Sequence, residues 1–280
     1  MKPDDPTRAD RWALLSDPHI DADVSAVSRW GESLAWNLRK VVGEILAERE
    51  PLDGVIINGD CAHIKGKPGD YRALADLLEP LREAGLPMLL TLGNHDGRAA
   101  FRDVFPRKEP GPVPDRLVTV VEGRWVIWLL LDSLREAGRV EGELGASQLD
   151  WLQGYLAENR SKPVILAAHH YPQTSRDDIF PGPAKIDIPG LLDGEEFLRM
   201  ANAHPQVKAY VFGHSHDWRV TAGGAEMHQI NLPSSSYAFN PSRPVGWVLA
   251  EVGPSGMVLE LRALDREHPE HGRRQELKWR

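Results

Sequence analysis

Three absences narrow what this chain can be. Its 280 residues include one cysteine, Cys61, so the chain can form no internal disulfide and cannot build a cysteine-rich metal site. No apolar run approaches the ~20 residues that a membrane-spanning helix needs, since the longest, residues 125–131, has the length of a strand. The first ten residues, MKPDDPTRAD, lack the basic and apolar regions of a signal peptide, which predicts a cytoplasmic protein.

Positively charged residues are outnumbered by negatively charged ones, and two common catalytic motifs are absent. Lysine and arginine number 33 against 41 aspartates and glutamates, and the net charge of -8 argues against a nucleic-acid partner. The sequence has neither the glycine-rich loop of a P-loop ATPase nor the GxSxG turn of a serine hydrolase. Hydrophobic residues make up 41% and charged residues 26%, which is typical of a globular protein.

The order of apolar segments predicts the fold class. Residues 13–16, 54–58 and 88–92 are expected strands, and they alternate with helical patterns at 24–45 and 68–84. Asp21 or Asp23 can cap the first helix, and Pro80 is expected to kink or split the second. This alternation predicts parallel strands joined by right-handed crossovers.

The second half of the chain changes character. Residues 117–121 and 125–131 are expected to form a hairpin, and a helix at 146–159 precedes strands at 164–168 and 207–212. Shorter strands follow as far as residue 261. The prediction is an α/β protein with a single domain over residues 1–264. It is a four-layer αββα sandwich, in which two mixed β-sheets pack face to face with helices outside. Residues 265–280 are expected to form a charged tail that is solvated or loosely docked.

Polar side chains follow five of the predicted strands at the point where each strand ends. These side chains are, in chain order, Asp17 and His19, then Asp60, then Asn94, His95 and Asp96, then His169, and finally His214 and His216. Because the carboxyl ends of parallel strands line one edge of a sheet, these groups are expected to share one cavity. Gly59, Gly93 and Gly213 each precede one of them and permit backbone angles and close approaches that a Cβ would block.

The types of side chain in this set point to metal chemistry. Without a thiolate the set is a poor match for a closed structural zinc site, whereas carboxylates with several imidazoles suit Mn, Fe, Zn or Co. Seven ligands are too many for one tetrahedral ion but fit two divalent ions that share a carboxylate. Two such ions, two carboxylates and a bridging hydroxide would leave the site near +1, which favours a phosphate. Such a pair can also lower the pKa of bound water from 15.7 to about 7.

The ordered series Asp17-x-His19, Gly59-Asp60, Gly93-Asn94-His95-Asp96, His169 and Gly213-His214-x-His216 resembles the calcineurin-like metallophosphoesterase superfamily. The resemblance covers roughly residues 11–231. In size and motif style it is closest to the bacterial class III cyclic-nucleotide phosphodiesterases. Any one motif alone is weak, since aspartate, asparagine and histidine are common in turns, but five coincidences in the right order are not expected.

The resemblance implies a role for each matched residue. Asp17, His19 and His216 would bind one metal ion, Asp60 would bridge, and Asn94, His169 and His214 would bind the other ion. A hydroxide bridging the metals would attack phosphorus. His95 would protonate the leaving oxygen and, with Asn94, hold the phosphate, and Asp96 would orient His95. His63 stands where relatives carry Asp, Asn or a metal-binding Tyr; it either touches the substrate or is a solvated loop histidine.

Other features remain open at this stage. His170 is expected to point away from His169, in the core or behind the metal ligands, and His204, His228, His268 and His271 are expected at the surface. Cys61 is expected to be a small packed residue. Residues 171–190 and 234–240 are expected to shape the pocket. The substrate is a small phosphate ester, with a phosphodiester favoured over a phosphomonoester. A non-catalytic scaffold of the same fold is the alternative from another class, and a homodimer is left open.

Overall fold

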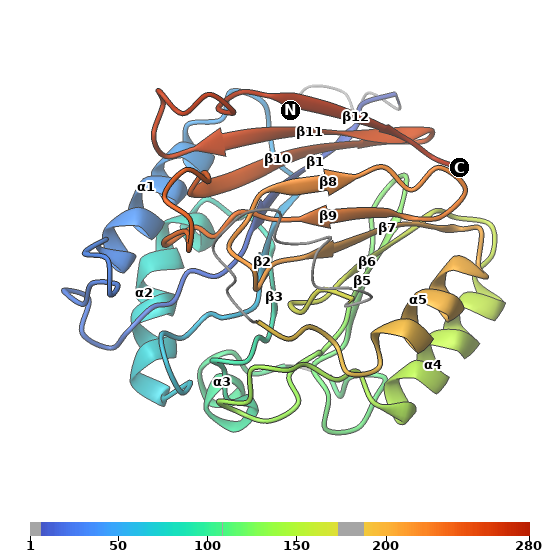
Figure 1. The fold of residues 1–280 in the computed structure, drawn as a ribbon, viewed down its shortest axis with the longest axis horizontal. Helices are drawn as coiled ribbons and strands as arrows, with labels where there is room; N and C mark the ends of the chain where they lie inside the picture. The colour runs from blue at the N-terminus through green and yellow to red at the C-terminus, as the bar shows by residue number, and fades with distance from the viewer. Residues whose placement is uncertain (1–6, 108, 173–187) are drawn as a thin grey trace.

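Two β-sheets form the centre of the molecule in the computed structural model, which describes residues 7–107, 109–172 and 188–280 (Figure 1). The first sheet contains β1 (Asp10–Leu15), β2 (Gly54–Asn58), β3 (Met88–Thr91), β10 (Gly246–Gly253), β11 (Gly256–Ala263) and β12 (Arg274–Lys278), in the spatial order β12-β11-β10-β1-β2-β3. The second contains β4 (Thr119–Glu122), β5 (Ile127–Leu130), β6 (Val164–Ala167), β7 (Val207–Phe212), β8 (Arg219–Thr221) and β9 (His228–Asn231), in the order β4-β5-β6-β7-β9-β8. Each sheet is mixed: β1, β2 and β3 are parallel in the first, as are β5, β6, β7 and β9 in the second.

Five helices cover the outer faces of the sheets within the described residues. They are α1 (Leu34–Leu46), α2 (Pro68–Glu83), α3 (Arg98–Val104), α4 (Ala146–Glu158) and α5 (Gly194–Asn202). Figure 1 shows α1 and α2 at one side of the molecule and α4 and α5 at the other. Separate apolar clusters join α1, α2 and α3 to the first sheet, the two sheets to each other, and α4 and α5 to the second sheet. These layers confirm the predicted αββα sandwich.

Strand β1 shows how the sequence produces these layers. All six of its residues are buried, because successive side chains of a strand point to opposite faces and both faces are covered. Ala13 and Leu15 face the helices, while Trp12 and Leu14 face the second sheet. There the Trp12 ring meets the ring of Trp128, with 5.7 Å between centroids. Residues 12–15 therefore form a continuous apolar run, as is typical of strands buried on both faces.

The first predicted helix is wrong over its first ten residues. Helix α1 begins at Leu34, and Val24 and Val27 are exposed at 43% and 52%. The Ser28 hydroxyl accepts hydrogen bonds from the backbone N–H groups of Trp30 (3.1 Å) and Glu32 (3.3 Å). Such local bonds compete with helix formation, so apolar spacing alone was misleading here.

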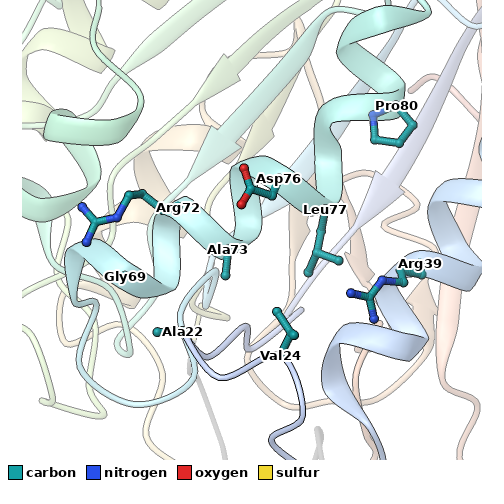
Figure 2. Close-up of a pocket in the computed structure, with 9 residues that line it drawn as sticks. All are labelled: Ala22, Val24, Arg39, Gly69, Arg72, Ala73, Asp76, Leu77 and Pro80. Atoms are coloured by element: carbon teal, nitrogen blue, oxygen red, sulfur yellow. The ribbon is translucent and has the colours of Figure 1, made fainter.

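The segment before α1 lies across helices α1 and α2. It borders a hollow of about 710 Å³, whose walls include Val24, Arg39, Arg72 and Asp76 (Figure 2).

Helix α2 matches its predicted span and continues through Pro80 instead of splitting there. The predicted hairpin is confirmed, because β4 pairs antiparallel with β5.

The C-terminal segment is more ordered than the sequence suggested. Residues 265–280 were expected to be a solvated or loosely docked tail, but Arg274–Lys278 form β12 at the edge of the first sheet. Leu277 is buried against the core between the sheets, and Arg274 forms ion pairs with Glu251 and Glu260. The charged residues of this stretch alternate with inward positions, which is how an edge strand keeps its outer face soluble.

The same strand covers a histidine expected at the surface. His228 on β9 is 6% exposed, and its Nε2 donates a hydrogen bond to the carbonyl oxygen of Lys278 (2.8 Å).

Residues 171–190 were expected to shape the pocket, but most of them, 173–187, lie outside the described residues. Among the helices of the described ranges, none has both the length and the apolar character needed to cross a bilayer.

Candidate metal centre

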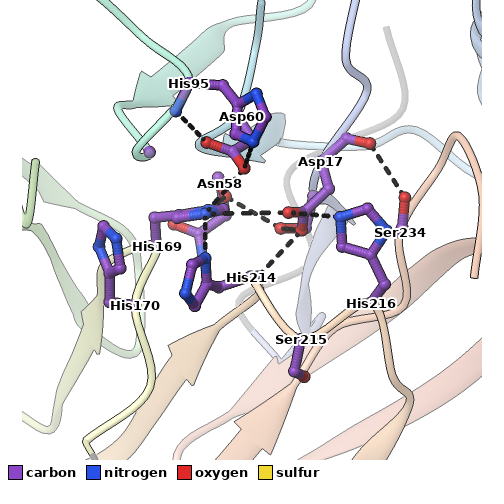
Figure 3. Close-up of polar contacts among 12 residues, drawn as sticks. Asp17, Asn58, Asp60, His95, His169, His170, His214, Ser215, His216 and Ser234 are labelled. Atoms are coloured by element: carbon purple, nitrogen blue, oxygen red, sulfur yellow. Dashed lines mark hydrogen bonds and ion pairs between the residues drawn. The ribbon is translucent and has the colours of Figure 1, made fainter. Parts of the chain in front are cut away.

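The carboxyl ends of strands from both sheets converge on one buried cluster (Figure 3). Asp17 and His19 follow β1, Asp60 follows β2, and Asn94 and His95 follow β3; His169 follows β6, and His214 and His216 follow β7. Seven of these eight side chains belong to groups whose donor atoms lie within 4.8 Å of one another. The eighth, Asn94, is buried beside His95. The structure therefore brings together seven of the nine side chains that the strand ends predicted.

One group of donors combines a carboxylate with two imidazoles. Nε2 of His216 lies 3.3 Å from Oδ1 of Asp17 and 3.0 Å from Nε2 of His19. The same Asp17 oxygen lies 3.9 Å from Nε2 of His19. These are the residues that the resemblance assigns to the first metal ion.

A second group lies on the other side of Asp60. Nε2 of His169 is 3.3 Å from Oδ2 of Asp60 and 3.2 Å from Nδ1 of His214. Oδ2 of Asp60 is also 3.7 Å from Nε2 of His19 in the first group. Asp60 thus lies between the two groups, where a bridging ligand is expected.

Backbone carbonyls fix which ring nitrogens face the cluster. His169 donates through Nδ1 to the carbonyl of Asn58 (2.9 Å), and His214 donates through Nε2 to the carbonyl of Pro189 (3.0 Å). Because a carbonyl only accepts, the neutral rings direct their unprotonated nitrogens at each other across 3.2 Å. Only a proton or a metal cation between them makes this contact favourable, and a carbonyl behind each ring is typical of metal-binding histidines.

Two buried oxygens of the expected ligands have no hydrogen-bond partner among the described residues. They are Oδ1 of Asp17 and Oδ1 of Asn94. A buried acceptor without a partner is destabilising by about 1–3 kcal/mol, so native proteins rarely keep one without a reason. Oxygen and imidazole donors of this kind suit first-row divalent metals. The residues present therefore fit a metal centre.

The backbone of the ligand loops is strained. Among the described residues, six that are not glycine have positive φ, and five of them are expected ligands: Asp17, His19, Asp60, His214 and His216, with φ between 46° and 68°. Left-handed backbone is uncommon for such residues and concentrates at functional sites. A Cβ on Gly213 would lie 2.5 Å from Oδ2 of Asp17, so this glycine allows the loops to approach each other.

The electrostatics of the cluster favour a bound cation. Burial acts to raise the pKa of Asp17 and of Asp60, but the neighbouring imidazoles, His169 first, lower both below the usual range. Burial acts to lower the pKa of His169, yet the charges of Asp60 and Asp17 raise it to about 9. Burial lowers the pKa of His214 to about 3. The two carboxylates therefore attract positive charge, either a proton on His169 or a metal ion in its place.

His95 lies at the open side of the cluster. Its Nδ1 donates to the carbonyl of His63 (2.6 Å), and its Nε2 lies 4.0 Å from Oδ2 of Asp60. The side chain is 32% exposed, whereas those of His19 and His169 are almost fully buried. Its ring packs edge-on against His19, with centroids 4.8 Å apart. This position fits a residue that meets substrate rather than metal.

Asp96 does not occupy the predicted position behind His95. Its carboxylate accepts hydrogen bonds from the backbone N–H groups of Cys61 (3.1 Å), Ala62 (3.0 Å) and Gly93 (2.9 Å) and from the hydroxyl of Tyr71 (3.0 Å). Burial, followed by the charge of Asp60, raises the pKa of Asp96 to about 6. Asp96 therefore ties the loop after β2 to the loop after β3, and the carbonyl of His63 takes the orienting position instead.

Several contacts around the cluster were not assigned from the sequence. Hydroxyls of Ser234 and Ser236 donate to the carbonyl of Asp17 (3.0 and 2.6 Å). The side chain of Asn58 donates to the carbonyl of Ala168 (2.9 Å) and accepts from Thr91 (2.8 Å). A detectable signal was present for Asn58, which ends the apolar strand β2, but not for Ser234 and Ser236, which lie three and five residues past the end of β9.

His170 and Cys61 are also settled by the structure. His170 is buried with its Nδ1 2.8 Å from the Ser133 hydroxyl, and its ring centroid is 4.5 Å from that of His214. It therefore packs behind a metal-ligand candidate, as predicted. It does not point away from His169, however, because the two ring centroids are 4.9 Å apart and the ligand atoms of His169, His170 and His214 lie within 4.8 Å of one another. Cys61 is fully buried, and burial raises the pKa of its thiol, which fits a packed residue rather than a nucleophile.

Comparisons with known proteins agree with this geometry. The family model described as calcineurin-like phosphoesterase matches residues 11–218. A probable cyclic nucleotide phosphodiesterase of Synechococcus sp. is 32% identical over 245 residues, which cover 87% of this chain and 88% of the relative. A glycerophosphodiester phosphodiesterase of Enterobacter lignolyticus is 28% identical over 211 residues, which cover 75% of this chain and 72% of the relative.

Solved structures share the fold. A dimetal phosphatase from Danio rerio superposes with a TM-score of 0.73 at 15% identity, covering 98% of this chain and 100% of that one. A purple acid phosphatase from yellow lupin gives a TM-score of 0.64 at 12% identity, covering 97% of this chain and 54% of that one. The family match spans most of the chain and includes every candidate ligand. The chain therefore belongs to the calcineurin-like phosphoesterase family of phosphoric ester hydrolases.

Proposed function

We propose that this protein hydrolyses a small phosphodiester, such as a cyclic nucleotide, at a centre of two divalent transition metal ions. The observation that carries this proposal is the convergence of imidazole nitrogens and carboxylate oxygens around Asp60, with the Asp17 oxygen Oδ1 buried and without a hydrogen-bond partner among the described residues. The phosphodiester class is supported by relatives that span most of this chain and are named probable cyclic nucleotide phosphodiesterases.

The two donor groups divide the ligands between the ions. Asp17, His19 and His216 would hold one ion, and Asn94, His169 and His214 would hold the other, with Asp60 shared between them. Ions bound there would supply Lewis-acid charge for the phosphate oxygens and lower the pKa of water. The carboxylates of Asp17 and Asp60 offset only half of the charge of two divalent ions, so the centre would remain positive and attract an anionic ester.

His95 would act on the leaving group. The hydrogen bond from its Nδ1 to the His63 carbonyl fixes the ring plane, so a proton carried on Nε2 would point toward the open side of the centre. A proton given to the departing oxygen from that position avoids the release of an alkoxide. The His63 side chain, 23% exposed and 3.4 Å from Oδ2 of Asp21 through its Nδ1, would border the same opening and contact the substrate.

A hydrolysis panel tests this function. The protein would be assayed with Mn, Fe or Zn against cyclic AMP, an aryl phosphodiester and an aryl phosphomonoester. We expect metal-dependent cleavage of the diesters, and hydrolysis of the monoester alone would contradict the proposal.

Two aspartates with similar backbone φ angles, Asp60 and Asp115, provide the test variant and its control. Asp60→Ala should abolish activity. Asp115→Ala should not, because Asp115 also has positive φ but is exposed. Full activity in Asp60→Ala would contradict the assigned metal centre.

A further inference from the structure

A row of aromatic rings leads from the metal centre to the surface. Tyr237 lies against two ligand candidates, with ring centroids 5.2 Å from His19 and 4.5 Å from His216. Phe239 stacks on His216 at 4.3 Å with an interplanar angle of 20°. Trp30 continues the row, 5.0 Å from Tyr237 and 5.9 Å from Phe239, and 40% of its surface is exposed.

The backbone holds Trp30 in this position. It lies in a turn in which Gly31 N–H donates to the Ser28 carbonyl (2.9 Å) and Ser28 N–H donates to the Glu32 carbonyl (2.8 Å). Ser28 is buried, and its hydroxyl accepts the N–H of Trp30. The exposed part of a tryptophan on a fixed turn can contact a ligand without the loss of entropy that a mobile loop would suffer on binding.

The other rings are fixed to the metal centre itself. His216 donates through Nδ1 to the carbonyl of Tyr237 (2.8 Å), and the hydroxyl of Ser236 donates to the carbonyl of Asp17. The segment that carries Tyr237 and Phe239 is thus bonded to two ligand loops. Its rings therefore keep a constant position relative to any phosphate bound at the centre.

We propose that Trp30, Tyr237 and Phe239 form a subsite that stacks the nucleobase of a nucleotide substrate, which extends the proposed phosphodiesterase function and rests on it. In a cyclic nucleotide a single ribose joins the base to the reacting phosphate. The base would therefore lie one ribose away from a phosphate bound at the centre, and the rings of Tyr237 and Trp30 extend outward from the ligand candidates His19 and His216. Stacking on aromatic rings is favourable for every base because each has a π-face.

The charge around the row favours a base over an aliphatic group. The guanidinium of Arg29 lies over the Trp30 ring, 4.0 Å from its centroid. Planar cations of this kind stack on aromatic faces and donate hydrogen bonds, which ring nitrogens and carbonyls of a base can accept. A glycerol or ethanolamine group has no π-face for Trp30 to stack on.

Substrate selectivity tests the subsite. The ratio of kcat/KM for cyclic AMP to kcat/KM for glycerophosphoethanolamine, a diester without a base, would be measured in the Mn-loaded protein. Trp30→Ala should lower this ratio about fivefold to a hundredfold, mainly through KM, and Trp30→Phe should restore part of it. The control is Trp36→Ala, which removes another exposed tryptophan (57%) that lies on α1, and it should keep the wild-type ratio.

A binding measurement separates this inference from the catalytic proposal. AMP and ribose 5-phosphate share a phosphate and a ribose but differ in the base, so titration calorimetry of both measures the contribution of the base directly. Wild type should bind AMP at least fivefold more tightly than ribose 5-phosphate, and Trp30→Ala should lose this preference. An equal preference in wild type and Trp30→Ala would overturn the subsite, as would no preference in wild type. Failure to hydrolyse any phosphodiester would instead overturn the proposed function.

Discussion

The structure gives Asp96 a structural role that a single substitution can test. Its two carboxylate oxygens each accept two hydrogen bonds: Oδ2 from Cys61 and Gly93, and Oδ1 from Ala62 and Tyr71. Asn in this position keeps only one acceptor oxygen. With that oxygen at the Oδ2 position, the amide NH₂ faces the N–H of Ala62, which loses its partner.

The size of the effect follows from this count. A buried donor without a partner is destabilising by about 1–3 kcal/mol, and the remaining bonds lose the strength that a charged acceptor gives. We therefore expect Asp96→Asn to lower the free energy of unfolding by about 2–4 kcal/mol. For a chain of this size, at about 2 °C per kcal/mol, that corresponds to a fall in Tm of about 4–8 °C. Metal content should fall as well, because the loop held by Asp96 carries Asp60.

The assay compares thermal unfolding by circular dichroism with metal content by mass spectrometry. Asp76→Asn is the matched control, since it makes the same chemical change at an exposed position on α2, in the hollow of Figure 2. It should change stability by less than about 0.5 kcal/mol. If Asp96→Asn kept its Tm and its metal and lost only kcat, with a shifted pH profile, Asp96 would orient His95 after all, and the reasoning would be refuted.

Three further predictions concern the metal, the loops and the edge strand. Chelation should lower Tm by roughly 5 °C, because a ligand at 100 times its Kd stabilises by about 2.7 kcal/mol; an unchanged Tm would contradict a resident metal. Gly213→Ala should lower the denaturant midpoint strongly, because the Cβ would lie 2.5 Å from Oδ2 of Asp17; Gly43→Ala, in open space within α1, should instead stabilise by about 0.5–1 kcal/mol. Leu277→Ala should destabilise by about 2–5 kcal/mol in the same measurement, and a value near zero would show that β12 does not dock.

The sequence was sufficient to predict that the polar residues at the ends of the strands form one site. A buried strand followed by a glycine and a polar residue is a local pattern, and topology alone brings such ends to one edge. Asp60 and His214 could therefore be assigned to one site from the sequence. The backbone strain at these positions could not be predicted, because a positive φ at aspartate or histidine changes neither the composition nor the periodicity of the sequence.

The errors at Asp96 and at the C-terminal strand came from contacts between distant parts of the chain. Asp96 follows His95 directly, so the sequence suggested a local role, but three of its four partners lie 25 to 35 residues away at Tyr71, Cys61 and Ala62. The residues around Leu277 were too charged to indicate a strand, since only one inward leucine and ion pairs to neighbouring strands support β12. Long-range pairing of this kind overrides local pattern.

Metal stoichiometry is the most direct test of the central claim that the strand ends form a centre for two divalent ions. Mass spectrometry of the purified chain should find close to two transition metal ions per molecule in wild type, and Asp60→Ala should hold fewer because both ions would share Asp60. Fewer than one ion per wild-type chain after incubation with Mn, Fe or Zn would contradict the account and would favour a non-catalytic scaffold of the same fold.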